Sequence, residues 1–149
     1  MSTNYYMMTT DKELVNKYFE GEYEIVDDPY LGYQIHIGKR AGGWRPLFEA
    51  HEKAYSSVSE LMQFIMNHSE IHIFDEYGES ISIAQLKEEL VDWAKNQEKR
   101  TIYYDDYVGY IEAPIDHVEM EKIDKRNAWL NIRYWHDKDG YDFTDRPFS

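Results

Sequence analysis

Three segments of the chain carry hydrophobic residues at helical spacing, and each follows a pattern typical of a helix start. A Thr or Ser precedes a Glu or Gln by three positions at residues 10–13, 57–60 and 82–85, which predicts three capping boxes. Hydrophobic residues then recur every three to four positions, the spacing that places them on one side of a helix. We therefore expect helices that begin at these boxes, with Gly21 ending the first and the third reaching about Lys99.

Strand-like alternation of hydrophobic and polar residues separates these helices. Residues 22–26 and 33–37 alternate on either side of an Asp-Asp-Pro turn, which favours a β-hairpin. A glycine-containing loop at 38–43 then leads to a returning strand at 44–49. Shorter runs predict further strands at 71–74 and 129–135.

Together these elements predict an α+β fold, in which a small antiparallel sheet packs with about three helices. The length of 149 residues fits a single domain. We assign residues 1–100 to the core and residues 101–149 to an acidic, tyrosine-rich C-terminal extension that packs on the core or trails it. Its last part, residues 137–149, is expected to be an extended tail.

Composition excludes several classes of protein. The chain has no cysteine, so disulfides, thiolate zinc sites and cysteine nucleophiles are excluded. It has no run of about 18 apolar residues and no signal-peptide pattern, so we expect a soluble cytoplasmic protein that does not enter membranes.

The net charge of −13 is unevenly distributed. Residues 1–30, 54–100 and 101–149 each carry a net charge of −5, whereas residues 31–53 carry +2. The acidic blocks argue against direct binding to nucleic acid, because phosphates would repel them. The basic segment is a candidate anion site.

The first candidate site is an acidic, tyrosine-rich segment after residue 100. Tyrosine often anchors protein interfaces, and carboxylates spaced like phosphates can fill a groove built for nucleic acid. Ordinary solubility charge is the competing interpretation. The residues expected to bind a partner are Tyr103, Tyr104, Asp105, Asp106, Tyr107 and Tyr110.

The second candidate is the basic segment with its glycines, where backbone N–H groups and basic side chains could hold a phosphate and a tryptophan could stack on a ring. It matches neither a Walker loop nor GxGxxG. The competing interpretation is a hairpin whose two glycines supply positive φ and whose tryptophan enters the core. The candidate ligand-binding residues are Lys39, Arg40, Gly42, Gly43, Trp44 and Arg45.

The histidines give little support for a metal or a cofactor. His36 and His72 each stand between two isoleucines in alternating runs, so they could meet on one sheet face, although separate solvent-facing histidines are commoner. The chain contains no HExxH motif, and residues 137–140 lack the glycine position and terminal Glu of a calcium loop. We expect neither metal nor cofactor.

Catalytic signals are equally sparse. Ser57 and Ser82 are better explained as helix caps than as nucleophiles. Glu112, Asp116 and Glu119 could pair for acid–base catalysis, but a solvated acidic face is the simpler interpretation. We expect no catalytic residues and no enzyme.

Several strings along the chain resemble a family of small accessory proteins encoded by tailed bacteriophages and prophages. They are residues 4–14 and 23–29, Ile-His-Ile-Gly-Lys-Arg at 35–40, Gly-Gly-Trp at 42–44, Asp-Glu-Tyr-Gly at 75–78, Asp-Lys-Asp-Gly-Tyr-Asp-Phe-Thr at 137–144 and the final Phe148-Ser149. The resemblance spans nearly the whole chain. It implies a setting in the bacterial host cytoplasm, where such proteins act on host machinery or defence, and it identifies no catalytic residues.

Two hypotheses follow. The first is a non-enzymatic phage inhibitor that binds a bacterial defence or nucleic-acid-handling protein, such as a CRISPR nuclease, through its acidic surface. The alternative is a small-ligand binder that uses the Gly38–Arg45 loop to sequester a signalling nucleotide. The sequence leaves the oligomeric state open.

Overall fold

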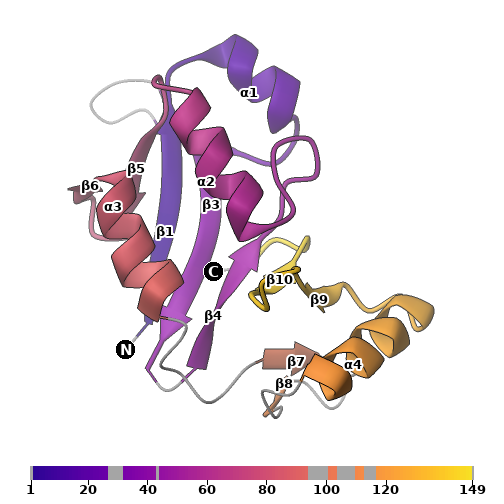
Figure 1. Cartoon of the computed structure of the whole chain (residues 1–149). Helices are drawn as coiled ribbons and strands as arrows, with labels where there is room; N and C mark the ends of the chain where they lie inside the picture. Colours follow the sequence, from indigo (N-terminus) through magenta and orange to yellow (C-terminus); the bar gives the residue numbers. More distant parts are fainter. Residues whose placement is uncertain are drawn as a thin grey trace.

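The computed structural model confirms the α+β class and is organised around a mixed sheet (Figure 1). The structure describes residues 2–26, 32–42, 44–93, 101–103, 110–112 and 117–148, without the side chains of 101–103, 110–112 and 117–120. Within these residues the main sheet has eight strands in the order β6-β5-β1-β3-β4-β10-β9, and β2 pairs with β3. The strands are β1 (Ser2–Thr9), β2 (Glu24–Val26), β3 (Gly32–Ala41), β4 (Trp44–Glu49), β5 (His72–Asp75), β6 (Ser80–Ile81), β9 (Tyr134–His136) and β10 (Asp142–Thr144).

The N-terminal strand β1, which the alternation did not predict, lies inside the sheet. It pairs antiparallel with β3 on one side and with β5 on the other. Its residues Tyr5 to Met8 are hydrophobic at every position, because both sheet faces use them, and this hides the period of two.

The predicted β2–β3 hairpin is confirmed, and so is the returning strand β4. The predicted loop at 38–43 is wrong, because β3 continues to Ala41, which pairs directly with Trp44. The chain therefore turns between Ala41 and Trp44, where the structure describes Gly42 but not Gly43.

Helices cover one face of the sheet (Figure 1). They are α1 (Lys12–Tyr18), α2 (Val58–Asn67) and α3 (Ile83–Leu86), which continues as the π-helical segment η1 (Lys87–Asp92). Two more elements follow at the far end, the hairpin of β7 (Thr101–Tyr103) with β8 (Tyr110–Glu112) and the helix α4 (His117–Trp129).

The predicted helix starts are confirmed at Ser57 and Ser82, whose hydroxyls accept from the backbone N–H of Glu60 and Gln85. The first box is wrong by one residue: Asp11, not Thr10, is the N-cap and accepts from the backbone N–H of Leu14 at 3.1 Å. A carboxylate caps at least as well as a hydroxyl, so the chain enters the helix one residue later.

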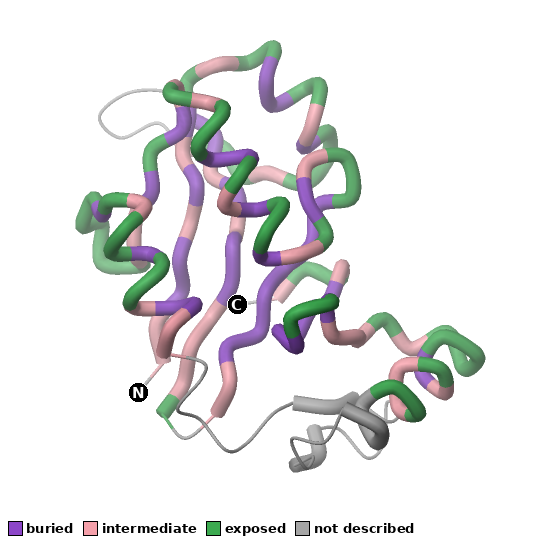
Figure 2. The backbone as a smooth tube through the Cα atoms, in the orientation of Figure 1, coloured by how far each residue is buried: buried purple, intermediate pink, exposed green. Residues whose placement is uncertain are grey.

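The hydrophobic core lies between this face of the sheet and the helices (Figure 2). Alternate strand residues such as Met7, Ile35 and Ile73 meet Leu61 of α2 and Leu86 of α3 in one cluster. Burial of this apolar surface is the main force that holds the layers together.

The predicted extended tail at 137–149 is wrong, because this stretch completes the sheet. Strand β10 pairs parallel with β4 and antiparallel with β9, and Phe143 is fully buried. The predicted strand at 129–135 is also wrong in its first part, because α4 reaches Trp129 and β9 begins at Tyr134.

Candidate functional site

Among the described residues, no helix covers the central strands on one face of the sheet, and we call it the open face. It consists of the residues that alternate with the core positions of β1, β3 and β5. These residues are Tyr6, Met8, Gln34, His36, His72 and Phe74, which are exposed or half-buried. The two histidines therefore share a face, which the sequence left open, but β1 lies between their strands and His72 is exposed.

A first groove with a volume of about 650 Å³ crosses the open face between β1, β3 and β5. Met8 and Phe74 line it with apolar surface, and Glu70, Asp75 and Glu76 line it with carboxylates. The groove thus combines an apolar lining with acidic groups, a combination suited to amphipathic ligands with a positive charge.

A second groove of about 560 Å³ adjoins the first and shares Tyr6 and Gln34 with it. Strands β3 and β4, the segment before β2 and the C-terminal segment form it. Its acidic lining residues are Glu22, Glu24, Glu49 and Asp145, and Phe148 contributes an aromatic ring.

Among the described lining residues the two grooves carry seven carboxylates and neither Lys nor Arg. Three of the seven have basic partners: Glu22 and Glu49 contact histidines, and Asp145 pairs with Arg133. Within the described part of the chain, the other four form no ion pair with a basic side chain. They are Glu24, Glu70, Asp75 and Glu76.

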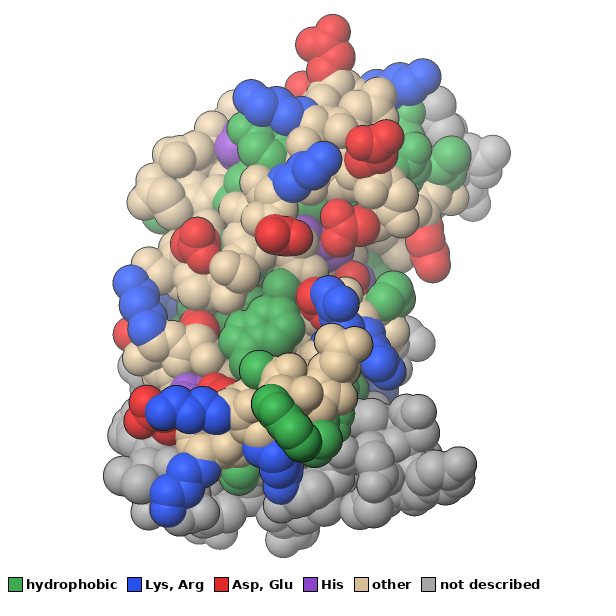
Figure 3. Space-filling view, turned by 90° about the vertical axis from the view of Figure 1, so that its right-hand side faces the viewer, with side chains coloured by type: hydrophobic (Ala, Val, Ile, Leu, Met, Phe, Trp, Pro, Cys, Tyr) green, Lys and Arg blue, Asp and Glu red, His purple; other side chains and the backbone are tan. Residues whose placement is uncertain are grey.

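Charge of the opposite sign gathers elsewhere on the molecule. Figure 3 shows the side that carries α4, where Lys and Arg side chains surround protruding hydrophobic ones in the lower half of the view. In the part of the chain that the structure describes, the acidic grooves thus lie apart from this group of Lys and Arg side chains.

Tyr6 lies at the junction of the two grooves. Its ring centroid is 5.4 Å from that of His36. Partial burial raises the pKa of the Tyr6 hydroxyl, and the negative charges of Glu76 and Glu24 raise it further. A neutral phenol flanked by carboxylates can donate a hydrogen bond and offer its ring to a cation.

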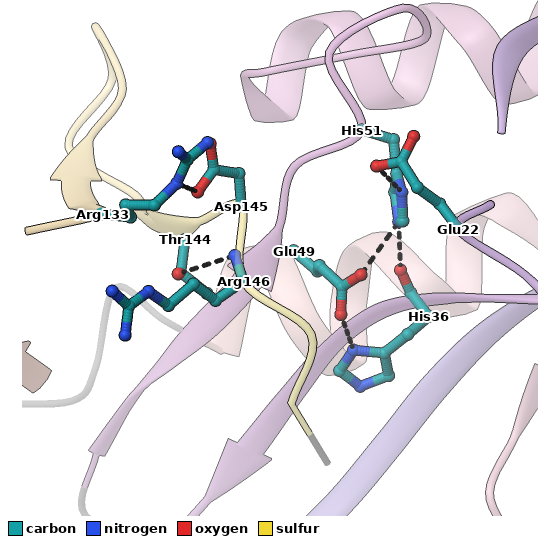
Figure 4. Close-up of polar contacts among 8 residues, drawn as sticks. All are labelled: Glu22, His36, Glu49, His51, Arg133, Thr144, Asp145 and Arg146. Carbon is teal, nitrogen blue, oxygen red and sulfur yellow. Dashed lines mark hydrogen bonds and ion pairs between the residues drawn. The ribbon is translucent and has the colours of Figure 1, made fainter. Parts of the chain in front are cut away.

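A chain of histidines and carboxylates, of which Glu49 and His51 are buried, lies at the second groove (Figure 4). Nδ1 of His36 is 2.9 Å from Oε1 of Glu49, and Nε2 of His51 is 3.6 Å from the other oxygen of Glu49. Nδ1 of His51 lies 3.3 Å from Glu22. The expectation that His36 faces solvent is therefore wrong, because this ring pairs with a carboxylate that is itself buried.

Both nitrogens of each ring are engaged. Nε2 of His36 is 2.8 Å from the side-chain oxygen of Asn4, and Nε2 of His51 is 2.8 Å from the backbone oxygen of His36. The ring of Phe148 packs edge-on against His36 with centroids 4.6 Å apart. The chain fixes the floor of the second groove and leaves neither ring nitrogen of His36 open to a ligand.

The predicted partner-binding segment lies mostly outside the described residues. Tyr103 and Tyr110 form a backbone pair of the β7–β8 hairpin. Tyr104, Asp105, Asp106 and Tyr107 fall between the described ranges.

The candidate anion-binding residues do not converge on one point. Lys39 and Arg40 are consecutive residues of β3, so their side chains leave the strand on opposite faces. Arg40 donates to the backbone oxygen of Glu89 at 2.8 Å, with its guanidinium 5.3 Å from the ring of Trp93. Arg45 donates instead to the backbone oxygen of Gly140 at 3.2 Å.

Gly42 and Trp44 also belong to the β3–β4 hairpin. Gly42 is exposed and its φ is not positive, so the expected positive φ is wrong at this residue, while Gly43 lies outside the described residues. Trp44 is half-buried at the start of β4. The basic segment 38–45 is therefore a β-hairpin.

Asp137, considered as part of a calcium-like string, has a structural use. Its buried carboxylate accepts from the backbone N–H groups of Val58, Asp139 and Tyr141 at 2.9–3.0 Å. No group of three or more His, Asp or Glu side chains within the described ranges is placed to hold a metal ion.

Sequence reasoning missed the open face because its residues come from distant segments. Tyr6 lies in β1, Glu24 in β2 and Glu70 in the turn before β5. The pairing of β1 with β3 and β5, and of β2 with β3, brings them together. A run of four large hydrophobic residues at 5–8 was the one available signal.

Comparison with known proteins found no matching protein family, no similar curated protein and no similar solved structure. In the described part of the chain, no helix has the length and apolar character needed to cross a membrane.

Proposed function

We propose that the protein is a non-enzymatic, phage-encoded inhibitor that captures a basic segment of a bacterial defence or nucleic-acid-handling protein on its open face. The observation that carries this proposal is the pair of adjoining grooves, whose described lining has seven carboxylates and no Lys or Arg.

Electrostatics favours a cationic occupant. Carboxylates form short, charge-assisted hydrogen bonds with Lys and Arg, and a surface of one sign steers a partner of the other sign towards it. Proteins that handle nucleic acid carry Lys and Arg for phosphate contacts. Glu24, Glu70 and Glu76 would take the place of those phosphates.

The aromatic and apolar lining adds the second half of the recognition. Tyr6 offers a ring between the carboxylates Glu24 and Glu76, and Met8 and Phe74 line the first groove. Aromatic residues in a desolvated centre supply much of the energy of protein interfaces. The expected partner segment therefore combines basic with apolar side chains.

The buried histidines support a binding role rather than catalysis. His36 and His51 have acceptors at their ring nitrogens and lie under the groove as a fixed floor. A general base needs a nitrogen that can reach the substrate proton.

The acidic tyrosine-rich residues 103–110 remain a proposed second contact with the same partner.

Affinity capture from a bacterial lysate tests the proposal. The wild type should retain a basic protein, and a double charge reversal, Glu24→Lys with Glu70→Lys, should lose it. Neither of these side chains makes a hydrogen bond to a described residue, so the variant is expected to fold.

A control with the same change in net charge separates the open face from overall acidity. Glu52→Lys with Glu88→Lys alters two exposed carboxylates that do not line the grooves. This control should retain the partner. Equal capture by both double variants would exclude the open face as the binding surface.

A further inference from the structure

The end of α4 presents a large hydrophobic surface to solvent. Trp129 is 85% exposed and the adjacent Leu130 is 47% exposed. A tryptophan this exposed is unusual, because its apolar area favours burial against a partner. We call Trp129 and Leu130 the α4 tip.

The α4 tip lies at a hydrogen-bonded turn. The backbone N–H of Ile132 donates to Asn127 at 2.7 Å and that of Asn131 donates to Ala128 at 3.2 Å, the pattern of a Schellman motif. Asn131 takes the left-handed position with φ of 59°. The buried side chain of Asn127 also donates to the backbone oxygen of Tyr134 at 3.1 Å. The fold therefore holds Trp129 out in a defined place.

Basic side chains outnumber acidic ones around the tip. Residues 121–133 contain Lys122, Lys125, Arg126 and Arg133 against Glu121 and Asp124, and Arg133 pairs with Asp145. Lys125 has a side chain that is 77% exposed, and its acidic neighbour Glu121 is 3.7 Å away. Exposed pairs of this kind are worth under about 1 kcal/mol, so a partner's carboxylate can replace Glu121.

The first groove has the complementary properties. Met8 and Phe74 offer apolar surface, Glu70, Asp75 and Glu76 offer negative charge, and the volume of about 650 Å³ is that of a pocket for a sizeable organic group. The α4 tip thus combines basic with apolar side chains, as does the partner segment that we propose for the open face.

The topology prevents this contact within one molecule. The first groove lies over β5, β1 and β3, whereas α4 contacts β9 at the opposite end of the strand order. Figure 1 shows α4 and β5 on opposite sides of the sheet. A tip that fills a groove must therefore belong to a second copy.

We propose that the α4 tip of one copy docks in the first groove of another, with Trp129 and Leu130 on the apolar lining and Lys122 and Lys125 towards its carboxylates. The inference rests on the proposed function, because it assigns the same groove the same class of ligand. Each copy uses a different surface, so the contact is head-to-tail and larger assemblies grow with concentration. Self-docking also competes with capture of the external partner.

Sedimentation velocity over a concentration series tests the proposal. The wild type should shift from monomer to dimers and longer species as concentration rises. Trp129→Ala should weaken this association by at least about tenfold, since a central tryptophan is a typical interface anchor. Met66→Ala, which truncates another side chain that is 64% exposed, is the matched control and should associate like the wild type.

A mixing experiment distinguishes head-to-tail docking from other contacts. The Glu24→Lys, Glu70→Lys variant keeps the tip but reverses the charge of Glu70 in the first groove and of Glu24 in the adjoining one. Trp129→Ala keeps the groove, so neither variant should associate alone. Their mixture should form a one-to-one dimer and stop there. A wild type that remains monomeric throughout, or a mixture that remains monomeric while the wild type associates, would overturn the proposal.

Capture of the external partner is measured separately with Trp129→Ala, whose groove is intact. If this variant captures the external partner and the wild type does not self-associate, only the self-docking proposal is rejected. Loss of capture by the wild type itself rejects the proposed function.

Discussion

The hydroxyl of Tyr55 is buried beside the histidine–carboxylate chain and finds no hydrogen-bond partner among the described residues. The ring packs against His51 with centroids 5.6 Å apart. Burial raises the pKa of Tyr55 well above its ordinary value, and the charges of Glu49 and Glu22 add to this. The aromatic ring therefore stabilises the fold, while the buried hydroxyl opposes it.

The raised tyrosine pKa values predict loss of stability in alkali. Burial also raises the pKa of Tyr5, to about 12. Above pH 10 the unfolded chain loses these phenolic protons while the folded chain keeps them, so the free energy of unfolding falls as pH rises. Each such group contributes a slope of about 1.4 kcal/mol per pH unit.

Tyr55→Phe removes one of these phenols, so the free energy of unfolding should fall less steeply above pH 10, by about 1.4 kcal/mol per pH unit. Near neutral pH the free energy of unfolding should be unchanged or slightly higher. Urea unfolding measured from pH 9 to pH 11 provides the check. Tyr77→Phe, at a side chain that is 64% exposed, is the control and should follow the wild type. Identical slopes for Tyr55→Phe and wild type would contradict the assignment.

Glu49 connects His36 and His51, and its removal leaves His36 without a carboxylate and His51 with Glu22 alone. We expect Glu49→Ala to lower the free energy of unfolding by about 3 kcal/mol, the usual cost of breaking a buried pair. Glu49→Gln keeps an acceptor for His36 and should cost less than half as much. Urea unfolding distinguishes them, and equal losses would show that packing alone stabilises this position.

At the scale of elements, the close approach of strands β3 and β4 determines where a glycine is needed. A Cβ atom at Gly38 would lie 2.7 Å from the backbone oxygen of Leu47 on the paired strand, whereas a Cβ atom at Gly42 would meet nothing within 4 Å. Gly38 thus allows β3 and β4 to approach next to the irregular pairing with β1. Position 38 therefore requires a glycine because the paired strand lies close to it, and not because the chain forms a loop there.

Gly38→Ala should therefore destabilise the protein by about 1–3 kcal/mol, the range for an overpacked site. Gly42→Ala should change stability by less than about 1 kcal/mol, because the site is open and its φ is not positive. The difference in unfolding midpoint between these two alanine variants is the measurement. A larger effect at Gly42 would contradict the strand assignment of residues 38–41.

Local signals explain which elements could be predicted. The caps at Ser57 and Ser82 and the β2–β3 hairpin depend on neighbouring residues, so the sequence is sufficient to find them. Strand β10 could not be found in this way, because its parallel pairing with β4 joins Phe143 to Phe48 across 95 positions. Its polar, turn-rich flanks favour an extended tail until Asp137 is seen to bind the start of α2.

At the scale of the whole molecule, the distribution of charge matters more than the net value of −13. The net charge of successive segments of the sequence identified residues 31–53 as the basic region. The arginines of this region, however, donate hydrogen bonds to backbone oxygens of other parts of the fold. The same sums concealed the basic residues around the α4 tip, because acids elsewhere in 101–149 outweigh them. Only the folded chain separates an acidic open face from this basic end.

Binding of the captured partner, measured as a function of salt for the wild type and both double charge reversals, tests the central claim most directly. Raising salt from about 0.1 M to 1 M shortens the screening length from about 10 Å to about 3 Å. The account predicts that affinity for the wild type falls steeply over this range, that Glu24→Lys with Glu70→Lys abolishes binding, and that Glu52→Lys with Glu88→Lys binds like the wild type. Affinity that is insensitive to salt and equal in all three proteins would contradict it.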